Sequence, residues 1–170
     1  MRHDSSQNPV PVMIVITQNL PIAEKILLAL TAIGLILLYS EGNARLLAWS
    51  LLGLGVVLFL YAFRPLASIE RAEGELGGFK ELLAQTILPK ITWIASGVSC
   101  LGIALYLFNL GNQGYAQALL TGSTIIAMSL LLICYFALTG TKNIRDTSLI
   151  FLRSVPLMIV DFYLLSQLGN

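Results

Sequence analysis

Two ionisable residues stand inside an apolar segment near the end of this 170-residue chain. Arg153 and Asp161 interrupt residues 149–168, which otherwise consist mostly of Leu, Ile, Val and Phe. An acid inside a membrane must be protonated or paired, and such acids commonly bind protons, cations or substrates. Asp161 and Arg153 are therefore the candidate functional polar residues, and proton- or cation-linked transport is the chemistry that Asp161 would serve.

Asp161 needs a partner other than Arg153, because on one helix the two residues are about 12 Å apart along the axis. Better candidates are hydroxyl groups on other apolar segments: Thr31, Ser50, Ser99, Thr121 and Ser123. Two structural interpretations compete with transport. Asp161 is either a hydrogen-bonded packing residue or part of an interfacial helix that leaves it in water.

Other chemistry cannot be assembled from the remaining residues. His3 is the single histidine, which excludes a histidine-based zinc site or a catalytic triad within one chain. The sequence has no Walker-type phosphate loop and no cysteines with metal-ligand spacing. Glu70, Glu73 and Glu75 are better explained as a solvated loop than as a cation site. We therefore expect no enzyme activity, no cofactor, no metal and no binding of nucleic acid.

The polypeptide is far too apolar for an ordinary soluble domain. Hydrophobic residues make up 56% of it and charged residues only 11%, against roughly 25% charged residues in typical soluble domains. Between Lys90 and Lys142 there is no charged residue at all. A bilayer can accommodate such a stretch as two spanning helices, so the sequence predicts an all-α, multi-pass membrane bundle.

The apolar segments predict transmembrane helices at about 22–40, 44–63, 91–110 and 115–138. Residues 1–20 form a polar tail and 21–170 a single membrane domain, with Pro21 suited to the first position of a helix. An amphipathic pattern near 79–88, ending before Pro89, predicts a short interfacial helix. Trp93 and other aromatic residues near the segment ends are typical of the interfacial belt.

The last segment, 149–168, is a conditional fifth span. Its apolar residues favour insertion by about 4 to 7 kcal/mol, whereas Arg153 and Asp161 each cost up to about 3 kcal/mol at the bilayer centre. These contributions nearly cancel, so insertion depends on neighbouring helices. The alternative is a helix that lies at the interface.

Small residues indicate where helices come close together. Gly53 and Gly55 lie in the second segment. In the third and fourth segments, the pattern predicts a hairpin sealed by small residues: Ser96, Cys100, Ala104, Ala118 and Gly122. Cys100 and Cys134 are expected at different depths, too far apart for a disulfide bond.

The lysine and arginine residues alternate between loops. Arg45 alone lies between the first two spans, and the other basic loop residues fall on the opposite side: Arg2, Lys25, Arg64, Arg71, Lys80, Lys90, Lys142 and Arg145. The positive-inside rule then places the N-terminus in the cytoplasm. The bacterial inner (plasma) membrane is the expected location.

We interpret the chain as a non-catalytic accessory or assembly subunit that acts through helix–helix contacts. Its expected partners are the lipid bilayer and other membrane subunits or a second copy of itself. The alternative is a small transporter or channel subunit that uses Asp161.

Overall fold

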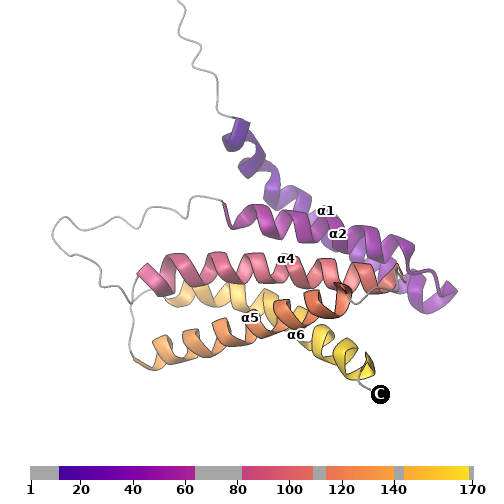
Figure 1. Ribbon diagram of the computed structural model, residues 1–170. Helices are drawn as coiled ribbons and strands as arrows, with labels where there is room; N and C mark the ends of the chain where they lie inside the picture. The colour runs from indigo at the N-terminus through magenta and orange to yellow at the C-terminus, as the bar shows by residue number, and fades with distance from the viewer. Residues whose placement is uncertain (1–11, 64–81, 109–113, 140–143, 169–170) are drawn as a thin grey trace, which may run out of the picture.

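The computed structural model describes residues 12–63, 82–108, 114–139 and 144–168, and all of this structure is helical apart from short turns (Figure 1). The α-helices are α1 (Val12–Glu41), α2 (Arg45–Tyr61), α4 (Leu88–Leu107), α5 (Gly114–Leu138) and α6 (Ile144–Leu168). A π-helical turn, η1 (Leu83–Ile87), precedes α4. The predicted all-α class is confirmed.

Three stretches are long and apolar enough to cross a membrane: Asn19–Glu41, Leu88–Leu107 and Gly114–Leu138. Helix α2 is equally apolar but shorter. Apart from α6, the helices carry few charges along their length because hydrocarbon, unlike water, cannot solvate a charged side chain. The composition thus supports a membrane protein with at least these three spanning helices.

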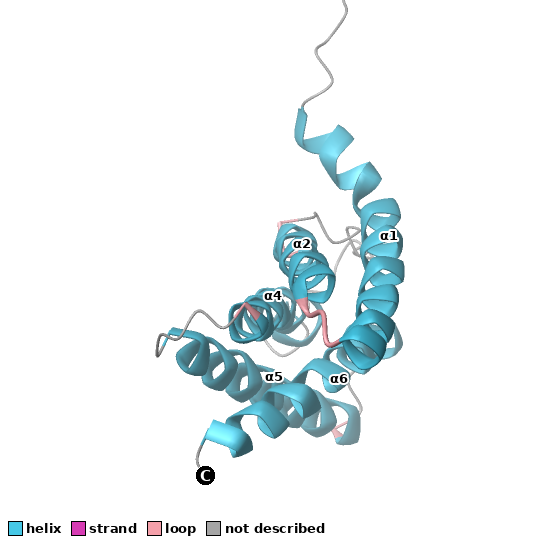
Figure 2. Cartoon of the chain, turned by 90° about the vertical axis from the view of Figure 1, so that its right-hand side faces the viewer, coloured by secondary structure: helices cyan, strands magenta, loops and turns pink. Residues whose placement is uncertain are grey.

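The helices pack in a chain of neighbours that closes into a bundle. Helix α1 packs mainly on α2, α2 packs on α4, and α4 also contacts α5 and α6, which contact each other. Figure 2 shows this order viewed toward the helix ends, with α6 returning toward α1. The buried core lies along α2 and α4.

Glycine allows the close approach between α2 and α4. A Cβ added to Gly97 would lie 2.8 Å from the Gly55 carbonyl oxygen, and one added to Gly55 would lie 3.0 Å from the Gly97 carbonyl oxygen. Neither backbone can move aside cheaply, so both positions require the absence of a side chain. This contact matches the use of small residues between helices in membranes.

Helix α1 begins at Val12, well before the first position that Pro21 suggested. Pro21 lies inside the helix rather than at its start. A proline removes one backbone hydrogen bond and crowds the carbonyl four residues earlier, which weakens a helix without always ending it. The prediction for the start of the first helix was therefore wrong.

The predicted interfacial helix near 79–88 also differs from the structure, although residues 79–81 lie outside the described ranges. From Leu82 the chain runs through η1 directly into α4, and Pro89 occupies the first turn of α4. Ala84 and Leu88 are buried against Ile133 and Phe136 of α5. A π-turn widens the helix just before the proline, where a regular turn would clash, so no separate surface helix forms from 82 onward.

Candidate functional site

Arg153 pairs with Glu24, a residue of the first predicted span that the sequence analysis did not single out. The Arg153 guanidinium Nη1 donates to Glu24 Oε1 at 2.9 Å, joining α6 to α1. The Glu24 side chain is only 10% exposed, whereas that of Arg153 is 58% exposed. In this ion pair the acid, Glu24, is buried, whereas most of the Arg153 side chain is exposed.

Tyr61, the last residue of α2, supplies the second contact to this acid. Its hydroxyl group donates to Glu24 Oε2 at 2.8 Å. Each oxygen of the carboxylate thus has a donor, as a buried carboxylate requires. Helices α1, α2 and α6 therefore meet at Glu24.

Trp93 of α4 completes this end of the bundle. Its ring stacks on Tyr61, with centroids 5.0 Å apart and an interplanar angle of 27°. Trp93 is 7% exposed, so it does not belong to the lipid-facing aromatic belt in which the sequence placed it. Tyr39, by contrast, is almost fully exposed, as a belt residue is.

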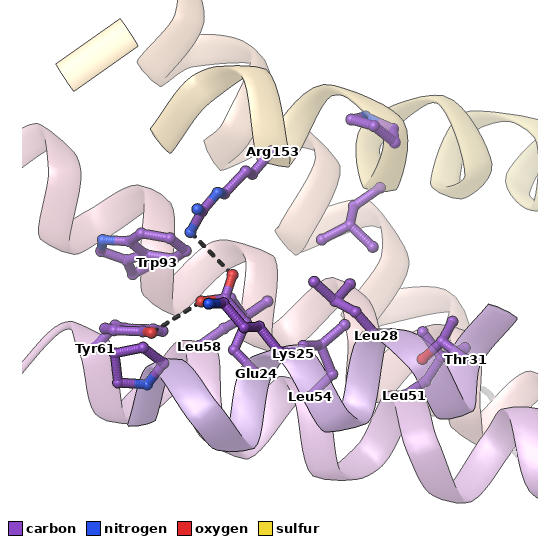
Figure 3. A pocket seen from close by; sticks show the side chains of 13 residues that line it. Glu24, Lys25, Leu28, Thr31, Leu51, Leu54, Leu58, Tyr61, Trp93 and Arg153 are labelled. Carbon is purple, nitrogen blue, oxygen red and sulfur yellow. Dashed lines mark hydrogen bonds and ion pairs between the residues drawn. The ribbon is translucent and has the colours of Figure 1, made fainter. Parts of the chain in front are cut away.

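These polar residues stand at one end of a cavity of about 720 Å³, which we call the α1–α6 crevice (Figure 3). Figure 3 shows Arg153 reaching from α6 across the crevice to Glu24. Lys25 also lines this end, and Thr31 lines the crevice further along α1. The other walls are almost entirely apolar and are formed by Leu28, Leu51, Leu54, Leu58, Trp93 and Leu157. The volume falls within the usual range for small-molecule sites.

The crevice exists because α1 and α6 are both held by other helices rather than by each other. Helix α1 packs on α2, and α6 packs on α4 and α5. The Arg153–Glu24 ion pair bridges the two helices at one end. Pro21 and Pro156 also line the crevice. The result is an amphiphilic space with charges at one end and leucine side chains along its length.

Asp161 lies elsewhere, in the packed region between α6 and α4. It is fully buried, and neither carboxylate oxygen has a hydrogen-bond partner among the described residues. Ser99 and Cys100 of α4 are the polar groups that interact with it. The Ser99 hydroxyl lies beside the carboxyl group but is itself without a well-formed hydrogen bond.

The other candidate partners of Asp161 are engaged locally. Thr31 donates to the Leu27 carbonyl and contacts the Ser50 hydroxyl at 3.1 Å, which links α1 to α2. Ser123 donates to the carbonyl of Leu119 in its own helix. Of the predicted hydroxyl groups, the structure brings Ser99 to Asp161.

A second polar contact joins α4 and α6 further along the same interface. The Ser96 and Ser154 hydroxyl oxygens are 2.9 Å apart, and Ser96 also donates to the Thr92 carbonyl. Either hydroxyl group can donate to the other. Both serines are buried, so this interface is closed and polar, unlike the crevice.

The small residues singled out in the sequence divide among several contacts. Gly53 lies against Leu27 of α1, and Gly55 lies against α4, with Cys100 also close to it. Gly122 of α5 lies against Ser99 of α4. Ser96 bonds to α6, and Ala104 is buried while Ala118 is partly buried. At the α4–α5 contact, Gly102 lies against Leu119 and Gly122 lies against Ser99.

Among the residues that the structure describes, no three His, Cys, Asp or Glu side chains gather to hold a metal ion. Cys100 and Cys134 are both free thiols. His3 and the acidic group Glu70, Glu73 and Glu75 lie outside the described ranges. Comparisons of the chain with protein-family models, curated proteins and solved structures find no match.

Sequence reasoning missed Glu24, although a signal was present. In the predicted five-span topology, Glu24 lies near the start of the first span and Arg153 near the start of the last, which would place both at one membrane level. An acid and a base at one level inside an apolar bundle are natural partners. The sequence analysis instead searched for partners of Asp161 alone.

Proposed function

We propose that this chain is a non-catalytic membrane subunit that binds an amphiphilic, lipid-like molecule in the α1–α6 crevice. The observation that carries the proposal is the crevice itself, in which charged side chains stand at one end of a leucine-lined space. A molecule with a polar head and an apolar chain matches both parts. The Tyr61 hydroxyl meets a base there, Glu24, but that carboxylate also pairs with Arg153, so we take binding rather than catalysis as the use of the crevice.

We further propose five spans, with the N-terminus cytoplasmic, in the bacterial inner membrane. The meeting of Glu24, Tyr61, Trp93 and Arg153 supports this topology. Glu24, Trp93 and Arg153 lie near the starts of the predicted spans 22–40, 91–110 and 149–168, and Tyr61 lies at the end of α2. Strict alternation of spans would put all four at one membrane face. In that orientation the polar end of the crevice faces the cytoplasmic leaflet, where the basic loop residues gather.

As an accessory subunit, the protein would act through contacts inside the bilayer, with other membrane subunits or with a second copy. Copurification in mild detergent tests this part of the proposal. A protein that always purifies alone as a monomer would contradict it.

The crevice proposal can be tested by quenching the fluorescence of Trp93, one of two tryptophans in the chain. Replacing the exposed Trp49 with Phe leaves Trp93 as the sole emitter. Trp93 is buried from the surroundings but lines the crevice, so a single-chain amphiphile with a brominated tail should quench it saturably when it occupies the site.

A matched pair of variants controls this measurement. Leu28→Phe with Leu157→Phe narrows the crevice from both sides and should weaken quenching. Ile26→Phe with Ile159→Phe adds the same rings to outward-facing positions of the same helices and should leave quenching unchanged. Equal quenching in both double variants would show that the probe reaches Trp93 from bulk detergent and would contradict the proposal.

A second candidate function, proton- or cation-linked transport, rests on the unpartnered and fully buried Asp161. Asp161 is not among the residues that line the crevice, so this function would need a separate path. If Asp161 carries the coupled ion, Asp161→Asn abolishes a pH-driven flux in proteoliposomes. A flux that Asp161→Asn leaves unchanged rules out this role.

A further inference from the structure

The charges at the polar end of the crevice do not balance. The lining residues there include two cations, Lys25 and Arg153, and one anion, Glu24. Both oxygens of Glu24 already accept hydrogen bonds, from Tyr61 and from Arg153. The Glu24 carboxylate therefore already has a donor on each oxygen, and the net formal charge of the three side chains at this end is positive.

Both cations have donors available for a ligand. Arg153 offers one nitrogen, Nη1, to Glu24, whereas a guanidinium group carries five N–H donors. Its side chain is 58% exposed. Lys25 is exposed and makes no hydrogen bond or ion pair within the described residues. An anion at this end would meet a guanidinium fork and an ammonium group together, which is the combination that phosphate groups favour.

The rest of the crevice sets the other half of the ligand. From Glu24 to Thr31 the lining extends seven residues along α1, or about 10 Å. Leu28, Leu54 and Leu157 line this length and offer no polar group. A free anion would leave these walls unused, whereas an acyl chain would cover them.

We infer that the crevice binds an anionic amphiphile whose phosphate-like headgroup contacts Lys25 and Arg153 and whose apolar chain lies along the leucine walls. This inference rests on the proposed function and specifies its ligand. A cationic headgroup fits poorly, because Glu24 is already paired and the Trp93 ring is buried against Tyr61.

The test compares three amphiphiles with the same brominated single chain and different headgroups: a phosphate monoester, phosphocholine and uncharged glycerol. Binding is measured by Trp93 quenching in the full-length Trp49→Phe protein, in uncharged detergent. The phosphate monoester should bind most tightly. Since one basic residue near a membrane surface changes anion affinity about fivefold, Lys25→Gln should weaken that probe about fivefold and leave the glycerol probe unchanged.

Matched variants separate a bound headgroup from general surface charge. Lys90→Gln removes a lysine near the start of α4 that does not line the crevice and should leave all three affinities unchanged. Lys25→Arg should restore the preference for the phosphate probe. Glu24→Gln should strengthen binding of that probe, because it frees Arg153 while Tyr61 keeps an oxygen acceptor.

The outcomes distinguish this inference from the function on which it rests. Saturable quenching with equal affinity for the phosphate and glycerol probes, or a preference for phosphocholine, contradicts the inferred preference for an anionic headgroup. Either result leaves the proposed binding function of the crevice intact. An absence of saturable quenching by all three probes overturns both. Displacement of the phosphate probe by inorganic phosphate would assign the site to a free anion and also overturn the amphiphile.

Discussion

The two buried acids of this protein lie in opposite surroundings. Glu24 stands at the edge of an open crevice and has a donor for each carboxylate oxygen, one from Arg153 and one from Tyr61. Asp161 stands in a closed interface beside the Ser99 hydroxyl, and within the described part of the chain neither its oxygens nor that hydroxyl has a well-formed hydrogen bond. One acid is supported by three helices, whereas the other is enclosed by packing.

This contrast shows that depth within a predicted span does not decide which acid lies beside a cavity. Asp161 lies deeper within its predicted span, 149–168, than Glu24 lies within 22–40, so Asp161 drew attention in the sequence. A committed ion pair next to a cavity points to a ligand more directly than an isolated acid in a packed interface. The predictions below test the closed region against the open one.

Adding volume to the closed region should have the largest effect. A Cβ at Gly122 would collide with Ser99 Oγ and lie 3.0 Å from the Ser99 backbone nitrogen. Gly122→Val should therefore lower the free energy of unfolding in detergent by about 3 kcal/mol, measured by denaturant titration with circular dichroism.

Gly114→Val is the control, because nothing lies within 4 Å of a Cβ at Gly114. Its cost should stay below about 0.5 kcal/mol. If the two valines cost the same, the interface around Ser99 and Asp161 is not closed, and the contrast between the two regions fails.

Breaking the ion pair between Glu24 and Arg153 should cause the second-largest loss of stability. Arg153→Gln leaves the buried Glu24 carboxylate with Tyr61 as its remaining donor, and removing one partner of a buried pair is costly. Because the Arg153 side chain is more than half exposed, we expect a loss of about 2 kcal/mol rather than the full cost. The double variant Glu24→Gln/Arg153→Gln should lose less than the sum of the single variants. Additive losses would mean that the ion pair contributes nothing.

The sequence predicts those features of the fold that a bilayer requires, which are the positions and lengths of the apolar helices. The bounds of α2, α4 and α5 came within about three residues, since a bilayer requires long apolar helices whatever their neighbours. Which face of each helix packs inward was not readable. A helix in lipid is apolar all round and lacks the stripe that marks the buried face of a soluble helix.

Trp93 and Arg153 illustrate this limit. Both lie near the start of a predicted span, 91–110 for Trp93 and 149–168 for Arg153, where aromatic and basic residues usually meet the interface. The structure turns Trp93 inward onto Tyr61 and extends Arg153 across to Glu24. Their level in the membrane followed from sequence position, but their direction around the helix axis depended on packing.

Substitution of Asp161 should change the free energy of unfolding in the opposite direction, toward higher stability. Asp161→Asn removes a buried carboxylate whose oxygens have no well-formed hydrogen bond among the described residues, and its amide can donate to the Ser99 hydroxyl oxygen. Replacing buried charge by a neutral group of the same shape is often neutral or stabilising. We expect the free energy of unfolding to rise by about 1 kcal/mol at neutral pH. A loss of more than about 1 kcal/mol would indicate that Asp161 has a partner in the folded protein.

Adding volume to the open region should have the smallest effect on stability. Leu28→Phe with Leu157→Phe places two larger rings at the crevice, where space already exists, so the free energy of unfolding should change by less than about 0.5 kcal/mol. Ile26→Phe with Ile159→Phe, on outward-facing positions, should match it. A loss near that of Gly122→Val would mean that the helices close over the crevice in solution, because only a filled space resists added volume. Stability that is insensitive to added rings, together with amphiphile binding that is sensitive to them, is what distinguishes a ligand site from packed core.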